Sequence, residues 1–295
     1  VSRQHCCGAD AGYRMGSQLK GLTENGHAKL KGGSRMFDRS RIAACAVWIV
    51  ALGLCTGSSS AGSEQQHDPG RFEVELEAGA AWQSRNDVEI PNDGTATRFS
   101  LKDLVGDGPW PAGRVYFTWS ITERHGVRLL LAPLSNTETG VFDSPVEFAG
   151  ESYAPGVPTE ATYQFNSWRV TYRYRLRAGE KWRWWIGFTA KVRDAKIRLE
   201  QETTASEDTD VGFVPLLYLR GEWRFAERWR FLLDLDALAG GPGRAEDLAL
   251  KVSYDFGDRW SLAGGYRTVE GGADVDEVYN CAWFNSVVIS AAYRF

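Results

Sequence analysis

Charged side chains at alternate positions are the residues of this 295-residue chain best suited to chemistry. In several segments a charged residue stands at every second position, and apolar or aromatic residues fill the positions between. The set is Arg128, Arg169, Arg173, Arg175, Lys191, Arg193, Arg220, Glu222, Arg224, Asp234, Asp236, Asp247, Lys251 and Arg267. Because both signs are abundant, these side chains can interlock as hydrogen-bonded ion pairs, or can line a polar path for a small solute.

A second charged group, the outer-rim cluster, lies toward the ends of the same segments. Its members are Asp194, Lys196, Arg198, Glu200, Arg244, Glu246, Glu270 and Asp274. Glycine-rich stretches at 240–243 and 271–272 flank it and let the backbone fold closely. Acidic runs at 207–210 and 274–277 offer oxygen ligands for a divalent cation. Charged runs in loops are usually solvated surface, and we expect neither a metal nor a cofactor.

Histidine, the commonest general base, is scarce in the patterned part of the chain. His67 precedes the first alternating segment and His125 falls in a short turn, so neither stands beside a nucleophile or a carboxylate at a rim. The sequence therefore predicts that the protein is not an enzyme. A lipid- or peptide-modifying mechanism that uses carboxylates alone, from Asp234 with Asp236 or from Asp247 with Glu270, is the alternative.

The elements that position these residues are strands, because polarity alternates with period two from Arg71 onward. Ten segments show the pattern, at about 72–83, 115–122, 127–131, 167–176, 184–200, 213–225, 229–236, 247–256, 260–267 and 281–295. In the segment 184–200 the alternation slips by one residue, and a β-bulge near Arg193 and Asp194 would explain the slip. Short connections alternate with long ones, the long ones at 83–113, 140–162, 202–210, 240–246 and 271–280.

Tryptophans gather at the ends of the apolar face. Trp119, Trp182, Trp184, Trp223, Trp229 and Trp260 lie beside the short turns, and Trp82, Trp168 and Trp283 lie toward the long connections. Two aromatic girdles are typical of a transmembrane barrel, whereas the core of a sandwich prefers aliphatic residues. We therefore predict an all-β fold, an antiparallel transmembrane up-and-down β-barrel of about ten strands. Eight or twelve strands are alternatives, and so is a soluble secreted β-sandwich.

The last residues carry a more specific signal. Phe295 ends the chain, Tyr293 stands two residues before it, and Ala291, Ile289 and Val287 continue on the same parity. This ending resembles the C-terminal assembly signal of bacterial outer-membrane β-barrel proteins, and the resemblance covers residues 71–295. It implies insertion by the barrel assembly machinery and contact with outer-membrane lipid and lipopolysaccharide. It also implies a small barrel, which we expect to be a monomer.

The first part of the chain has the pattern of an export signal. Arg39 and Arg41 precede an apolar run at 42–54, and small residues follow up to Ala61. We interpret 36–61 as a cleaved signal peptide, 1–35 as an upstream unpatterned segment and 62–70 as an N-terminal periplasmic segment. The expected location is the cell outer membrane. A single anchor helix or a lipidated Cys55 is the less favoured alternative.

Charge and barrel size bound the function. Without residues 1–61 the chain has 26 Lys and Arg against 35 Asp and Glu, a net charge of −9, which argues against nucleic acid as a partner. A ten-strand lumen is only slightly wider than an eight-strand one that side chains fill, so the charged set should interlock across it. We predict a non-enzymatic barrel that is either structural or a narrow small-solute channel with a plugged lumen.

Overall fold

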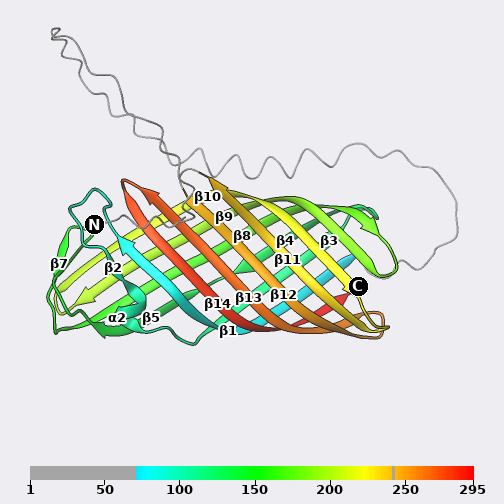
Figure 1. Cartoon of the computed structure of the whole chain (residues 1–295), viewed down its shortest axis with the longest axis horizontal. Helices are drawn as coiled ribbons and strands as arrows, with labels where there is room; N and C mark the ends of the chain where they lie inside the picture. Colours follow the sequence, from blue (N-terminus) through cyan, green and yellow to red (C-terminus); the bar gives the residue numbers. More distant parts are fainter. Residues whose placement is uncertain (1–70, 241–242) are drawn as a thin grey trace, which may run out of the picture. The chain divides into compact units, whose positions relative to one another are not determined.

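Ten strands, each antiparallel to the next along the chain, close into a barrel in the computed structural model (Figure 1). The structure describes residues 71–240 and 243–295, so the segments 1–35, 36–61 and 62–70 lie outside the described residues. The barrel strands are β1 (Phe72–Glu89), β3 (Trp110–Ser120), β4 (His125–Ala132), β8 (Pro158–Ala178), β9 (Trp182–Gln201), β10 (Thr204–Arg224), β11 (Trp229–Gly240), β12 (Gly243–Phe256), β13 (Trp260–Val275) and β14 (Val278–Arg294).

A continuous ladder between the first and last strands closes the barrel. β1 pairs with β14 from Glu73 opposite Arg294 to Glu89 opposite Tyr279. The predicted up-and-down barrel of ten strands is therefore confirmed, and the alternative of two stacked sheets is wrong. Closure matters physically because an open sheet edge would leave backbone groups without hydrogen-bond partners. In the described residues no helix is long and apolar enough to cross a membrane.

The outer surface of the barrel is an apolar belt. Outward side chains such as Phe188, Phe213 and Ile289 are 67%, 64% and 68% exposed. On β8 the belt runs from Trp168 to Leu176, close to the roughly 9–11 residues that a strand needs to cross a bilayer. A belt of this kind around a closed barrel suits hydrocarbon rather than water.

Aromatic rings gather on the outer surface at the short-turn end, the end that carries both Phe72 and Phe295. Phe72 stacks on Phe295 with ring centroids 5.8 Å apart, and Trp182 stacks on Trp223 at 5.3 Å. Trp229 meets Tyr254 edge-on at 4.9 Å. These contacts form the girdle that the tryptophan positions predict.

The predicted β-bulge near Arg193 and Asp194 is wrong. β9 pairs without a register shift with β8 on one side, from Glu200 to Trp185, and with β10 on the other. Register shifts occur instead in β1, between Gln83 and Arg85, and in β8, between Arg175 and Arg177. Ile197 and Leu199 therefore point inward like Lys191. They are apolar because apolar side chains, instead of charged ones, fill the lumen at their level.

Three of the predicted long connections are also wrong. The strands occupy most of the described residues in 202–210, 240–246 and 271–280. β9 and β10 pair as far as Gln201 and Thr204, and β13 and β14 as far as Val275 and Val278. β8, β9 and β10 thus extend well past the apolar belt as a wall. The connections 90–109 and 142–157 do carry extra elements, namely β2 (Phe99–Ser100), α2 (Leu101–Val105), β6 (Val146–Phe148) and β7 (Glu151–Tyr153), while β5 (Ser135–Val141) pairs with β8.

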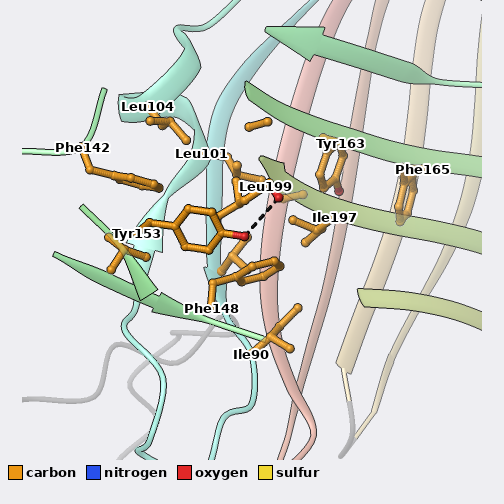
Figure 2. Packing of buried hydrophobic residues seen from close by; sticks show 14 of the residues in the cluster. Ile90, Leu101, Leu104, Phe142, Phe148, Tyr153, Tyr163, Phe165, Ile197 and Leu199 are labelled. Atoms are coloured by element: carbon orange, nitrogen blue, oxygen red, sulfur yellow. Dashed lines mark hydrogen bonds between the residues drawn. The ribbon is translucent and has the colours of Figure 1, made fainter. Parts of the chain in front are cut away.

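These extra elements fill the barrel at its long-loop end, opposite the short turns. Leu101, Leu104, Phe142, Val146, Phe148 and Tyr153 form an apolar plug against the inward wall residues Tyr163, Phe165, Ile197 and Leu199 (Figure 2). The Tyr153 hydroxyl donates to the Leu199 carbonyl at 3.0 Å. Gly140 of β5 lies against the Leu104 carbonyl so closely that a Cβ would not fit. The plug is therefore a packed core rather than a loose loop.

The inward orientation of the β9 extension can be tested with adjacent substitutions. Leu199 is fully buried and Glu200 is exposed. Leu199→Ala should lower the free energy of unfolding by about 2–4 kcal/mol, because it leaves a cavity in the plug. Glu200→Ala should change it by less than about 0.5 kcal/mol. Guanidinium titration in detergent micelles, followed by tryptophan fluorescence, measures both, and the reverse order would contradict this orientation.

Candidate functional site

Asp247 of β12 is a carboxylate of the lumen that accepts hydrogen bonds from three arginines. Arg114 Nη1 of β3 and Arg169 Nη2 of β8 each donate to Asp247 Oδ2 at 2.7 Å, and Arg267 of β13 donates to Oδ1. Both Asp247 and Arg169 are almost fully buried. Three strands that are distant in sequence are thus joined through one carboxylate inside the barrel.

A second group of ion pairs lies around Asp234 and Glu222. Asp234 Oδ2 accepts from Arg128 at 2.5 Å and from Arg220 at 3.1 Å. Glu222 lies 2.7 Å from Arg183 and 3.3 Å from Arg230. Arg220 also donates to Glu222 and so joins the two carboxylates.

The first strand completes the arrangement from the other side of the lumen. Lys251 Nζ donates to Glu75 at 2.5 Å and to Glu77 at 2.9 Å, and Arg267 Nε donates to Glu77 at 2.9 Å. We call the whole set the lumen network, and its members are Glu75, Glu77, Arg114, Arg128, Arg169, Arg183, Arg220, Glu222, Arg230, Asp234, Asp236, Asp247, Lys251 and Arg267. Oppositely charged groups meet across the interior, so the network occupies the space that a pore would need.

The structure brings nine of the fourteen residues predicted for the lumen into this network. The other five lie elsewhere. Arg173 and Arg175 face a cavity at the short-turn end, and Arg224 is exposed at that end. Arg193 pairs with Asp210 nearer the plug. Lys191 is buried with its Nζ 4.7 Å from the centroid of the Phe165 ring, and it makes no ion pair within the described ranges.

The outer-rim cluster does not surround the mouth of the barrel. Asp194, Lys196, Arg198 and Glu200 lie on the outer face of β9, beyond the apolar belt, while Arg244, Glu246, Glu270 and Asp274 lie on the outer face of β12 and β13. β10 and β11 separate the two groups. Within them Arg198 pairs with Glu200 at 2.7 Å, and because both side chains are exposed this pair contributes little to stability. Arg244 pairs with Glu270 at 2.9 Å, where the Glu270 side chain is largely covered.

Neither of the two carboxylate pairs considered for catalysis is arranged as a catalytic pair. Asp234 and Asp236 are buried and held by Arg128 and Arg169. Asp247 faces the lumen, whereas Glu270 lies on the outer face. Within residues 71–240 and 243–295, no three or more His, Cys, Asp or Glu side chains are grouped to hold a metal ion.

A cavity of about 720 Å³ lies at the short-turn end. It is lined by four carboxylates, Glu73, Glu123, Glu222 and Asp258, and by eight arginines, Arg71, Arg124, Arg173, Arg175, Arg183, Arg220, Arg230 and Arg294. We call this cavity the basic vestibule. Sequence reasoning looked for a site at the other end and missed it, although the inward parity of Arg173 and Arg175 was a usable signal.

Farther into the barrel the free space is small. A cavity of about 40 Å³ lies between the lumen network and the apolar plug, where Glu77 and Arg169 face Phe165 and Phe284. This volume holds only one or two water molecules. The vestibule therefore ends at the network.

Comparisons with known proteins concern the fold alone. The chain matches no known family profile and no curated protein sequence. Among solved structures it is similar to the outer membrane protease OmpT from Escherichia coli, with 11% identity, 80% of this chain and 100% of that chain covered, and a TM-score of 0.48. It is also similar to the translocator domain of the autotransporter NalP from Neisseria meningitidis, with 11% identity, 87% of this chain and 96% of that chain covered, and a TM-score of 0.38. A third similar structure is Ail of Yersinia pestis in complex with a heparin analogue, with 9% identity, 76% of this chain and 99% of that chain covered, and a TM-score of 0.37.

The contribution of the lumen network can be measured at Asp247, whose carboxylate meets three arginines. Asp247→Asn keeps the shape of the side chain but removes the charge that three arginines share, and buried cations are left uncompensated. We expect the free energy of unfolding to fall by about 3–5 kcal/mol. Asp143→Asn is the matched control, because Asp143 is exposed and makes no ion pair within the described ranges, and it should change stability by less than about 0.5 kcal/mol. Equal stabilities in denaturant titrations would show that the network is not a structural element.

Proposed function

We propose that the protein is an integral outer-membrane barrel whose lumen is sealed, and that it acts as a structural, non-conducting and non-enzymatic component rather than as a solute channel. The observation that carries the proposal is the presence of two successive barriers inside one closed wall. The lumen network crosses the barrel first, and the apolar plug fills the long-loop end beyond it.

The outer surface supports the proposed location. An apolar belt and an aromatic girdle are the features that a barrel surface needs in contact with lipid and lipopolysaccharide. Tyr293 and Phe295 belong to the girdle, because their rings stack on each other at 5.9 Å beside Phe72. They lie where β14 closes on β1, a place at which assembly machinery could act on the last strand. The closed ladder leaves no barrel edge for a partner strand, which supports a monomer.

The two barriers support a sealed state because they are of different kinds. A solute that passed the network would have to break buried ion pairs such as Arg169 with Asp247. It would then have to displace Phe148 and Tyr153, whose side chains are fully buried. Each step costs several kcal/mol, and the 40 Å³ cavity between the barriers offers no intermediate site for a solute.

The position of His125 supports a non-enzymatic role. Its Nδ1 lies 2.7 Å from the Tyr172 hydroxyl, and its ring packs edge-on against Tyr174 with centroids 5.2 Å apart. The imidazole therefore contacts aromatic residues at the short-turn end. Its contacts there are with phenol rings instead of a nucleophile and a carboxylate.

Planar bilayer recordings test the sealed lumen. The refolded wild-type protein should show no conductance steps at moderate voltage, once resistance to urea extraction has shown that it is inserted. A variant that removes a pair from each group of the network, with Arg128→Ala, Asp234→Ala, Arg169→Ala and Asp247→Ala, should remain closed because the plug persists. A variant in which residues 143–156 are replaced by a short Gly-Ser linker should remain closed because the network persists. The variant that combines both changes should conduct. Stable steps from the wild type would overturn the proposal in favour of a channel.

A further inference from the structure

The basic vestibule has the composition of an anion site, and this composition goes beyond what a sealed structural barrel requires. We propose that it binds a small soluble polyanion that carries phosphate groups. The inference concerns the short-turn end alone, so it does not depend on whether the lumen farther in is sealed.

Charge is the first argument. The lining contains eight arginines and four carboxylates, an excess of four positive charges around about 720 Å³. Two of the carboxylates are already engaged. Glu222 accepts from Arg220 and Arg230 and lies 2.7 Å from Arg183, and Glu73 accepts from Arg294 at 2.9 Å. Asp234 and Asp255, which are not part of the lining, pair with Arg220 and Arg230 and offset part of this excess. The wall therefore compensates the lining arginines unevenly, and Arg173 and Arg175 are the ones with no buried carboxylate partner.

Arg173 is the residue on which the site is centred. It lies on the inward face of β8 and is half-buried, and no carboxylate of the described residues is within ion-pair distance of it. Its guanidinium carbon lies 5.1 Å from the centroid of the buried Trp185 ring. Contact with an aromatic face orients a guanidinium while leaving its N–H donors available. The side chain is thus held in place with donors that a ligand can use.

Arg175 is the second such residue, two positions farther along the same face. Its nearest carboxylate oxygen belongs to Glu123, at 3.8 Å, and the Glu123 side chain is 94% exposed. A pair of this length at the surface contributes little and is easily replaced. Arg173 and Arg175 therefore present two guanidinium groups from one strand face toward the same cavity.

The chemistry of these groups selects the ligand class. Planar guanidinium forks match the oxygen geometry of phosphate, and several forks that converge favour an anion with more than one phosphate group. The cavity volume lies in the range of roughly 300–1,000 Å³ that small-molecule sites occupy. Phosphate can be supplied by a free polyphosphate or by a lipid headgroup. The vestibule lies inside the ring of short turns, away from the lipid-facing belt, which favours the free anion.

Isothermal titration calorimetry with tripolyphosphate as the probe tests the site on the full folded protein in phosphatidylcholine nanodiscs. We expect one saturable site in the wild type. Arg173→Gln should weaken binding about tenfold, the equivalent of one charge-assisted hydrogen bond, and Arg175→Gln should weaken it similarly. Glu123→Gln should strengthen it. Because neither arginine has a buried carboxylate partner, both variants should fold, and circular dichroism checks this.

The matched control is Arg198→Gln on the outer face of β9, where Arg198 pairs with exposed Glu200. It removes the same charge from another surface and should leave the affinity unchanged. No saturable binding by the wild type, equal affinities of the wild type and Arg173→Gln, or an equal loss in Arg198→Gln would each overturn the proposal. Nanodiscs that contain phosphatidylglycerol separate the two sources of phosphate. If the tripolyphosphate affinity is the same in these nanodiscs, the site is one for a soluble anion. If phosphatidylglycerol lowers the affinity of the wild type but not that of Arg173→Gln, the headgroup competes for the site, which overturns the assignment to a soluble anion.

Discussion

The ladder between β14 and β1 constrains everything else in this molecule, because a closed sheet has only an inside and an outside. Alternate side chains of each strand must face either the lumen or the surroundings of the barrel. The outside of the belt is apolar, so the polar half of each strand is directed inward. Charges that are buried in this way require partners, and the lumen network follows from that requirement.

The inward faces change in character along the barrel axis. Near the short turns they carry arginines around a cavity, in the middle they carry paired charges, and near the long-loop end they carry Tyr163, Ile197 and Leu199. The apolar end becomes stable only because α2 and the β6–β7 hairpin supply Leu101, Phe148 and Tyr153 to cover it. β8, β9 and β10 are longer than a membrane-crossing strand needs to be because their extensions form the wall around the plug.

Sequence patterns predicted the wall well and the interior less well, for a physical reason. Along each strand, apolar side chains of the belt alternate with polar side chains of the lumen. This alternation predicted the ten strands and which side chains of each strand point inward. The same alternation disappears where the lumen itself is apolar, so Ile197 and Leu199 were interpreted as a bulge. Arg114 was missed because Trp110 and Pro111 open β3 without alternation.

Partners across the lumen are harder still to predict, because pairs such as Lys251 with Glu75 are set by barrel closure rather than by local spacing. The basic vestibule illustrates the same difficulty, since its arginines come from several strands and a turn. What distinguishes Arg173 and Arg175 of the vestibule from the arginines of the network is the supply of buried carboxylates. In the middle of the barrel each buried cation but Lys191 meets at least one carboxylate, whereas Arg173 meets an aromatic ring instead. A buried arginine that pairs with a carboxylate is explained by the stability of the barrel. A guanidinium that is oriented but lacks a carboxylate is better explained by a ligand than by the stability of the barrel.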